Sequence, residues 1–498
     1  MNTRIKLYAF TFFAFFSMIS FAQTISGKVT DKDENPIPYA AIKVGRFVGT
    51  TTNEEGEFAI DLKKFQKMKW IEISSLGFKP LKIEKNEFTS KKYVLEDEVN
   101  EIGEVSLSSK KLTVLEILEK VQQNAVENYE TNLKGNIFAR SADQVHVEEF
   151  KIDVLKSPMF SKKELKKINK EMNEEFEKDM ETAAKSYTEK YFSYCKKDGN
   201  VKVNVEKYVS IKDEENERTT EKIVEKVQSR FTAHLDTTST YKVKTGIFTV
   251  DDSLKVGGMI SKEPKKKEDN LTTYKTAKLK GSLAKVFAKN TIQEDSKFDF
   301  IYETKKYNYE LLGVSKYEGE NIYIINFNPK RSSAKYIGKM YVSTQDFGVF
   351  RIDYKFAEGK KGESLNMKLL LGVAYKENKW DATVIYTRMS SGKFALNFVK
   401  EYEGTNIYLN RSLKFIKNRV SKFDKKDKTK LEFKFVLDDL SNTEMVFMNS
   451  ELLEENDFAN MEEREEFKVE HLNKYDASIW EDYNIIKPTK ELLEFELN

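Results

Sequence analysis

The sequence is poor in the residue types on which most catalytic and metal sites depend. It has one cysteine and three histidines in 498 residues. Cys195 cannot form a disulfide within this chain, and its place in the aromatic run "YFSYC" predicts a small buried residue rather than a reactive thiol. His146, His234 and His471 fit no metal-binding or nucleophile-activating pattern. We therefore expect a protein that is not an enzyme, with no catalytic residue, no metal site and no cofactor.

The chain also lacks an excess of charge of either sign, and it has little proline. Lys and Arg number 84 against 81 Asp and Glu, so no overall electrostatic field favours nucleic acid, and we expect no nucleic-acid partner. There are only 7 Pro, whereas Tyr and Phe number 24 and 35. This composition favours long strands in which one face is partly wet.

Long hydrophobic runs are absent after the first residues. The start, "MNTRIKLYAFTFFAFFSMISFAQ", has two basic residues, an apolar run from Leu7 to Ile19, and small residues Ser20 and Ala22. This pattern predicts a signal peptide over residues 1–22. A retained membrane anchor is the alternative, although the run is short for a membrane span. We expect an exported chain without a later transmembrane segment, in the periplasm or associated with the outer membrane or cell surface.

Short alternating strands separated by turns occupy residues 23–98 and predict a small β-sandwich. Three ordered motifs lie here: "ISGKVTDKDENPIPYAAIKV", "GTTTNEEGEFAI" and "ISSLGFKPLKI". They resemble the carboxypeptidase-regulatory-like domain of Bacteroidetes exported proteins. The resemblance implies a transthyretin-like sandwich that acts as a scaffold or interaction module and does not imply peptidase activity.

The acidic stretch "TTNEEGEFAI" within this domain raises the question of a calcium site. A helix–loop–helix calcium loop aligned on Gly56 needs an acid at the first position and a glutamate at the twelfth. Those positions hold Thr51 and Leu62. We therefore predict a hairpin turn at Asn53 to Gly56, where glycine can adopt a positive φ.

Two amphipathic helices are predicted. Thr113 and Glu116 form a capping box at the start of a helix that ends near Tyr129, within a connector-and-helix region at 99–135. Ser161 and Glu164 form a second capping box, and apolar residues then repeat every three or four positions, which predicts a helical insertion over 161–191. We favour a helix lying across a sheet; a partner-binding arm and membrane-surface binding are the alternatives.

Strand patterns dominate residues 136–440 and predict a large antiparallel curved sheet or half-barrel under the two helices. The succession "YEGENIYIINF…YIGKMYVSTQDFGVFRIDY" is similar to half-barrel periplasmic lipoprotein carriers. That resemblance implies an apolar concavity, but no single binding residue. The alternation selects a candidate lining for an apolar ligand: Tyr323, Ile325, Phe327, Phe350, Ile352 and Tyr354. The alternatives are an ordinary filled core and a transmembrane barrel, which the acidic end of the chain argues against.

The remaining expectations concern the end of the chain and a modification. Residues 441–498 read as an acidic tail that docks on the β body. The motif "DSL" is similar to O-glycosylation acceptors of Bacteroidetes exported proteins, which makes Ser253 a candidate for modification.

Together these patterns predict a non-enzymatic exported binding or scaffold protein of the Bacteroidetes cell envelope. Its partner would be an apolar ligand or an envelope protein. The alternative is a surface or outer-membrane interaction module without a small ligand, and a hydrolase is the third hypothesis.

Overall fold

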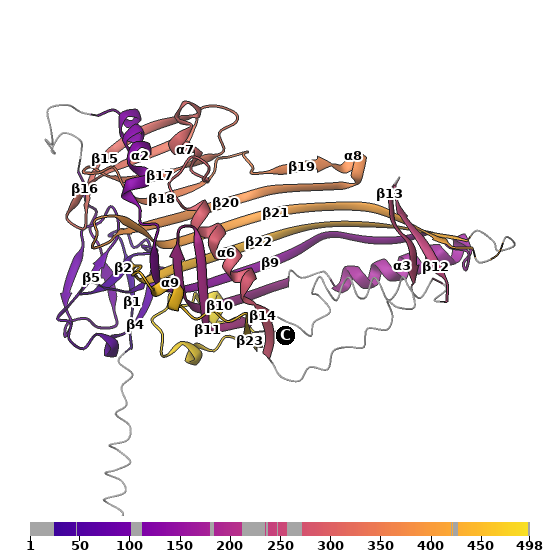
Figure 1. The fold of residues 1–498 in the computed structure, drawn as a ribbon, viewed down its shortest axis with the longest axis horizontal. Helices are drawn as coiled ribbons and strands as arrows, with labels where there is room; N and C mark the ends of the chain where they lie inside the picture. Colours follow the sequence, from indigo (N-terminus) through magenta and orange to yellow (C-terminus); the bar gives the residue numbers. More distant parts are fainter. Residues whose placement is uncertain are drawn as a thin grey trace, which may run out of the picture. The chain divides into compact units, whose positions relative to one another are not determined.

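The computed structural model describes residues 24–45, 47–100, 112–179, 184–211, 235, 238–246, 248–255, 271–419, 421 and 427–496. The expected signal peptide lies outside these residues. The chain divides into two units, coloured by sequence in Figure 1. Unit 1 contains the N-terminal part of the chain to Glu101, Val314–Asn321 and Asp476–Glu494, and unit 2 contains the remainder.

Unit 1 is built on two small sheets, and this confirms the predicted sandwich. The first has the order β4 (Glu57–Asp61), β1 (Thr24–Thr30), β7 (Lys92–Val94), and the second the order β3 (Phe47–Thr51), β2 (Ala41–Val44), β5 (Trp70–Ser74), β6 (Leu81–Glu84). The turn η1 (Leu62–Phe65) and strand β8 (Val99–Asn100) complete it. Alternate residues of both sheets form one core, which includes Val29, Ile42, Val44, Phe58, Ile60, Ile71, Ile73, Phe88 and Tyr93.

The stretch "TTNEEGEFAI" forms a turn between β3 and β4, as predicted, but the prediction of a hairpin was wrong. β3 pairs with β2 in one sheet and β4 with β1 in the other, so the turn connects the two sheets. Gly56 has φ +72°, and its N–H donates to the Asn53 carbonyl at 3.0 Å. The Asn53 side-chain oxygen accepts the backbone N–H groups of Glu55 and Glu57 at 3.0 and 2.8 Å. Asn53 is fully buried, so its amide stabilises the turn from within the protein.

The C-terminal segment of unit 1 lies against the sandwich. It contains η3 (Ala477–Trp480) and α10 (Lys490–Leu493). The Thr50 hydroxyl donates to the Ile485 carbonyl at 3.0 Å, and Lys487 pairs with Glu57 at 2.6 Å. We expected this tail to dock on the β body, but residues 476–494 group with the sandwich. The apolar pattern indicated a docked segment without indicating its partner.

Unit 2 is mostly β, with one large curved sheet that stays open along the described strands. The strand order is β14 (Leu271–Lys275), β23 (Glu466–Leu472), β11 (Asn200–Ile211), β10 (Ala184–Lys197), β9 (Leu133–Lys156), β22 (Lys428–Leu452), β21 (Phe394–Lys417), β20 (Val373–Arg388), β18 (Val349–Phe356), β17 (Tyr336–Ser343), β16 (Glu320–Pro329), β15 (Tyr307–Tyr317). Outside this order, β12 (Thr240–Thr245) pairs with β13 (Phe248–Lys255) and β21, and β19 (Ser364–Met367) pairs with β20.

Four neighbouring strands, β9, β22, β21 and β20, are unusually long and lie side by side (Figure 1). β22 has 25 residues, and a fully extended strand of that length spans about 80 Å. The prediction that a tail begins at residue 441 was wrong, because β22 continues to Leu452. The consecutive apolar residues of "TEMVFMNS" belong to this strand and not to a separate segment.

Helices pack on one face of the sheet, which we call the helix face. Phe287 of α6 (Thr276–Lys289) contacts Tyr194 and Phe447, with ring centroids 5.7 and 5.6 Å apart. Elsewhere α2 (Val114–Asn128) contacts α7 (Asp299–Tyr302), which is followed by η2 (Thr304–Lys306), while α8 (Lys368–Leu371) and α9 (Asp457–Asn460) are single turns. Within the described residues, we find no helix that has both the length and the apolar character needed to cross a membrane.

Both predicted capping boxes are confirmed. Thr113 and Glu116 cap α2 reciprocally. Ser161 N–H donates to Glu164 Oε2 at 2.7 Å, and Glu164 N–H to Ser161 Oγ at 3.3 Å, at the start of α3 (Lys162–Asp179). The prediction that this helix runs to residue 191 was wrong, because β10 begins at Ala184. A spacing of four residues fits both a helical face and one face of a strand, which explains the error.

Candidate functional site

Five of the six residues predicted to line a concavity are buried on the helix face. Ile325, Phe327, Phe350, Ile352 and Tyr354 are each at most 3% exposed. Tyr323 is half-buried. The sheet register brings them together through β17, where Met340 lies between Ile325 and Ile352, and Gly338 lies between Phe327 and Tyr354.

Aromatic residues of the α7 segment fill the space over these side chains. The ring of Phe300 stacks on Phe327 with centroids 4.1 Å apart, and it lies 5.4 Å from Tyr354. Phe298 packs on Tyr354 edge to face at 5.7 Å. Phe298 and Phe300 are fully buried. The five buried residues therefore belong to a packed core, which we call the α7 core. A ligand could reach Phe327 and Tyr354 only if the α7 segment moved.

Phe298 and Phe300 were missed by sequence reasoning. The run "KFDFIY" carries the signal, because it places three bulky apolar residues within four positions. The Cβ that any other residue would have at position 338 would meet the Phe327 ring and the Tyr354 backbone, so Gly338 permits the close aromatic packing.

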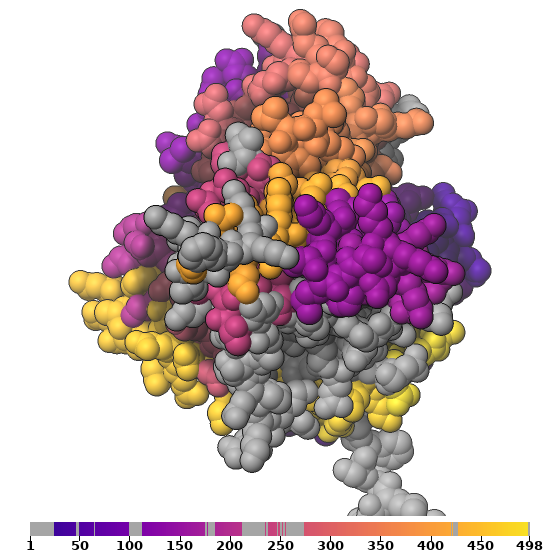
Figure 2. Space-filling model, turned by 90° about the vertical axis from the view of Figure 1, so that its right-hand side faces the viewer, coloured from indigo at the N-terminus to yellow at the C-terminus, as the bar shows by residue number. Residues whose placement is uncertain are grey.

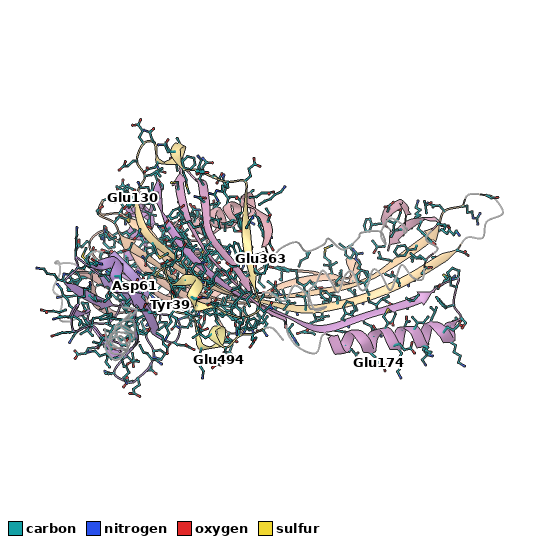
Figure 3. The ribbon with its side chains drawn as sticks, turned by 90° about the horizontal axis from the view of Figure 1, so that it is seen from below. Tyr39, Asp61, Glu130, Glu174, Glu363 and Glu494 are labelled. Carbon is teal, nitrogen blue, oxygen red and sulfur yellow. The ribbon has the colours of Figure 1, made fainter. Side chains whose placement is uncertain are left out.

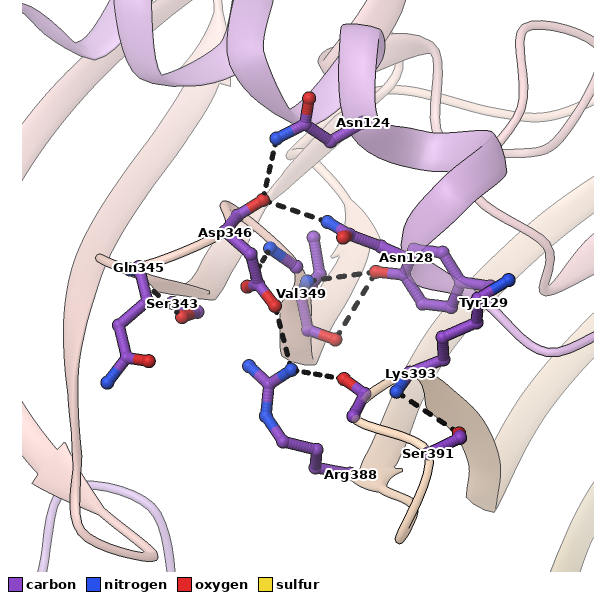
Figure 4. Close-up of polar contacts among 12 residues, drawn as sticks. Asn124, Asn128, Tyr129, Ser343, Gln345, Asp346, Val349, Arg388, Ser391 and Lys393 are labelled. Atoms are coloured by element: carbon purple, nitrogen blue, oxygen red, sulfur yellow. Dashed lines mark hydrogen bonds and ion pairs between the residues drawn. The ribbon is translucent and has the colours of Figure 1, made fainter.

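A polar clamp holds the end of α2 at the turn between β17 and β18 (Figure 4). Asn124 and Asn128 donate from their side-chain amides to the Asp346 carbonyl at 2.8 and 2.9 Å. The Tyr129 hydroxyl accepts the first N–H of β18 at 2.9 Å, and Arg388 donates to Asp346 Oδ2 at 2.7 Å. Burial by itself raises the pKa of Asp346, but the hydrogen bond and charge of Arg388 hold that pKa below its ordinary value. The clamp therefore stabilises the fold by holding α2 at this turn.

The opposite face of the sheet carries a buried row of charges. Arg140 of β9 lies between Glu189 of β10 and Glu444 of β22, and all three are at most 5% exposed. The guanidinium lies 2.6 Å from Glu189 and 3.8 Å from Glu444. Burial by itself lowers the pKa of Arg140, and the two carboxylates more than reverse this. The two carboxylates share one guanidinium, and this buried ion-pair row is a structural contact between three adjacent strands.

The middle of the helix face presents a different surface. Two rows of apolar side chains cross β9, β22, β21 and β20 in register, and we call them the apolar rows. One row is Val147, Leu437, Ile407 and Tyr375, and the other is Phe150, Phe435, Leu409 and Val373. Apart from Leu437, which is 8% exposed, these residues are only half-buried. Apolar surface that stays partly open on adjacent strands is typical of binding surfaces.

Helix α3 forms a wall at one end of the apolar rows. It runs along the long strands, as Figure 3 shows at the label of Glu174, and this part of the chain (purple) faces the viewer in Figure 2. Met172 packs with Ile152, and Val147 and Phe150 pack against this pair. Leu165 packs with residues at the ends of β9, β21 and β22.

Two asparagines of α3 also pair with the free edge of β9. The Asn173 oxygen accepts the Ile152 N–H at 2.9 Å, and its nitrogen donates to the Ile152 carbonyl at 3.1 Å. Asn169 makes the same pair with Val154 at 2.8 and 3.3 Å. One turn of helix separates the two amides, so together they replace a neighbouring strand.

Behind the apolar rows, the opposite face is polar. Glu149 and Lys434 form an ion pair at 2.5 Å, and His146 is exposed. Glu148 is hydrogen-bonded to Asp438, which raises the pKa of Glu148. The long strands are therefore amphipathic here, with most of the apolar side chains of the described residues on the helix face.

Unit 1 has a shallow cleft of about 810 Å³ beside β5 and β6. Trp70 forms its apolar floor, and the Lys82 ammonium lies 4.2 Å from the ring centroid. Lysines 69 and 85 also line it. Ile83, Glu84 and Asn86 complete the lining, so the cleft combines a small apolar surface with charges of both signs.

Two other predicted positions are placed as follows. Cys195 is 6% exposed in β10, and burial raises the pKa of its thiol, which fits the predicted buried residue. Ser253 lies in β13, but its side chain falls outside the described part of the structure. Its modification stays a prediction.

Comparison with known proteins supports the assignment of the N-terminal part. Residues 25–107 match the family model of the CarboxypepD_reg-like domain, so unit 1 carries a domain of this family. No curated protein matches the chain by sequence.

Two solved structures show a distant likeness. One is a LolA superfamily protein from Nitrosomonas europaea, with 9% identity and a TM-score of 0.19 over 71% of this chain and 99% of that one. The other is described as an outer membrane lipoprotein-sorting protein domain from Vibrio parahaemolyticus, with 10% identity and a TM-score of 0.18 over 68% and 95%. Superpositions of this quality do not establish a shared fold.

Proposed function

We propose that the protein is an exported, non-enzymatic binding protein of a Bacteroidetes-type cell envelope that holds an apolar molecule against the apolar rows. The observation that carries the proposal is the register of the two rows, which places eight apolar side chains on one face of four adjacent strands. Ordinary core positions of the same sheet are almost fully buried, whereas most of these residues keep exposed surface.

The chemistry of the rows favours an alkyl or aromatic ligand. Val147, Leu409 and Phe435 offer no hydrogen-bonding side-chain groups, and the Tyr375 hydroxyl is the polar atom among the eight side chains. Burial of half-exposed side chains of this size contributes about 1 kcal/mol each. Several such contacts support binding of an acyl chain without any specific polar recognition.

The test compares two substitutions on adjacent strands. Leu409→Asn places an amide in an apolar row, whereas Val436→Asn places one on the opposite face, and both residues are half-buried. We expect Leu409→Asn to weaken binding of an environment-sensitive naphthylamine probe about fivefold or more, because an unpaired amide replaces apolar contact. Val436→Asn should leave binding within about twofold, as expected of a control on the polar face.

Native mass spectrometry and lipid extraction of protein purified from its own envelope provide the independent readout. We expect an apolar molecule to accompany the protein. If no such molecule is recovered and both variants bind the probe equally, the ligand-binding role is contradicted. The packed α7 core favours the second candidate in that case, an interaction module without a small ligand.

A further inference from the structure

The hairpin formed by β19, α8 and β20 ends in an exposed apolar tip. Leu369 is fully exposed and Leu370 is 81% exposed, while Leu365 is 50% exposed. In Figure 1, α8 lies at the end of the hairpin, above β21, which extends farther. Two adjacent leucines at this exposure are unusual on a protein surface, where large apolar residues are normally scattered and partly covered.

The tip is held in a fixed conformation. Gly372 adopts φ +63° and its N–H donates to the Lys368 carbonyl at 3.0 Å, which closes the single turn of α8. The Gly372 carbonyl accepts the Asn410 N–H at 2.7 Å, which ties the turn to β21. The Lys368 ammonium lies 4.1 Å from the centroid of the Tyr408 ring. Leu369 and Leu370 are therefore presented outward by a braced turn.

The charges around the tip are positive. From residue 364 to residue 376 the hairpin contains Lys368 and Lys376 and no acidic residue. Glu363 and Glu377 lie at its base, where Glu363 pairs with Lys335 at 3.0 Å. A tip that carries exposed leucines flanked by lysines is complementary to an anionic lipid surface. The apolar side chains enter the interface, and the ammonium groups contact the lipid phosphates.

We propose that the tip of this hairpin docks on a lipid bilayer by inserting Leu369 and Leu370 between anionic headgroups. The apolar rows begin one residue beyond Gly372, since Val373 pairs with Leu409. Docking would therefore bring the open ends of the rows to the bilayer, the natural source or destination of an acyl ligand. This last point rests on the proposed function, whereas the docking itself depends on the tip alone.

The test uses the purified protein with the same N-terminus in every variant. Vesicles of phosphatidylethanolamine and phosphatidylglycerol are co-sedimented with wild type, with the double variant Leu369→Ser/Leu370→Ser, and with Val126→Ser as the matched control. Val126 is 87% exposed on α2 and far along the chain from the tip. We expect the affinity of the double variant for vesicles to be at least tenfold lower, because complete burial of one leucine side chain raises a binding constant by about tenfold or more. Lys376→Gln should weaken binding about fivefold.

A second measurement locates the contact. Leu370→Trp should show quenching of its fluorescence by vesicles that contain brominated lipid, and Val126→Trp should not. Unchanged vesicle binding of the double variant, or equal quenching at both positions, would overturn the proposal. Self-association of the wild type that disappears in the double variant and is unaffected by vesicles would also overturn it, since it would identify a second copy as the occupant.

The outcome is separable from that of the ligand-binding test. The double variant should bind the naphthylamine probe normally in the absence of vesicles, and Leu409→Asn should sediment with vesicles normally. Loss of vesicle binding with retained probe binding thus reports on the tip alone.

Discussion

The α7 core and the apolar rows lie on the same face of the same sheet, yet one is closed and the other half open. Both arise from strands that alternate apolar and polar residues. In the α7 core, Phe298 and Phe300 of a neighbouring segment fill the face, and Phe327 and Tyr354 are almost fully buried. Over the rows, Phe435 and Leu409 keep part of their surface exposed. The difference shows that alternation determines the direction of a side chain, whereas its burial depends on what packs above it.

The largest expected effect is the difference in lost stability between a substitution in the α7 core and one in the apolar rows. Phe300→Ala should lower the free energy of unfolding of unit 2 by about 3–5 kcal/mol, because the cavity left between Phe327 and Tyr354 cannot collapse fully. Phe435→Ala should cost only about 1 kcal/mol, because that ring is already half-exposed. Urea unfolding monitored by fluorescence measures both. Equal losses would show that the rows are as tightly packed as the core and would remove the distinction.

A smaller effect is expected at the wall of the apolar rows. The double variant Asn169→Ala/Asn173→Ala should destabilise unit 2 by about 1–3 kcal/mol, because backbone groups of Ile152 and Val154 lose their partners. Hydrogen exchange at these two amides should accelerate, while the amides of β22 should be unaffected. Glu177→Ala, an exposed change on the same helix, is the control. Unaltered exchange at Ile152 would contradict the strand-like role of the two asparagines.

The smallest effect concerns the clamp beside the α7 core and appears as a pH dependence. The pKa of Asp346 is lower in the folded protein than its ordinary value. Its contribution to stability is therefore present above the unfolded pKa, near 4, and is lost as the pH falls through the folded pKa. Because the pair is partly exposed, we expect a loss of about 1 kcal/mol.

Asp346→Asn should abolish this part of the acid sensitivity, whereas Asp295→Asn, at an exposed site, should not. The measurement is the free energy of unfolding from pH 7 to about 3. An unchanged pH profile in Asp346→Asn would show that Arg388 does not stabilise the folded carboxylate.

Local patterns predicted much of the fold. The capping pairs Thr113–Glu116 and Ser161–Glu164 marked both helix starts, because each involves residues three positions apart. The turn at Asn53 and the strand at Val349–Phe356 were likewise confirmed. In each case the determining contacts lie within the segment itself.

Features that depend on distant segments could not be predicted in this way. The apolar rows combine residues 147 and 437, and their alignment depends on pairing between strands almost three hundred positions apart. Likewise, nothing near Phe327 in the sequence indicates that Phe300 will stack on it. The six predicted residues lie on the helix face, while the open surface lies elsewhere on that face.

The buried charges at Arg140 have a consequence for how such long strands find their partners. A slip of two residues between β9 and β22 would keep every apolar side chain on its proper face, so the apolar pattern alone tolerates it. That slip would carry Arg140 away from Glu444, and the same slip between β9 and β10 would carry it away from Glu189. Breaking a buried ion pair in this way costs about 3–5 kcal/mol. The ion pairs of Arg140 thus favour one register of the three strands over shifted registers that the hydrophobic contacts alone would allow.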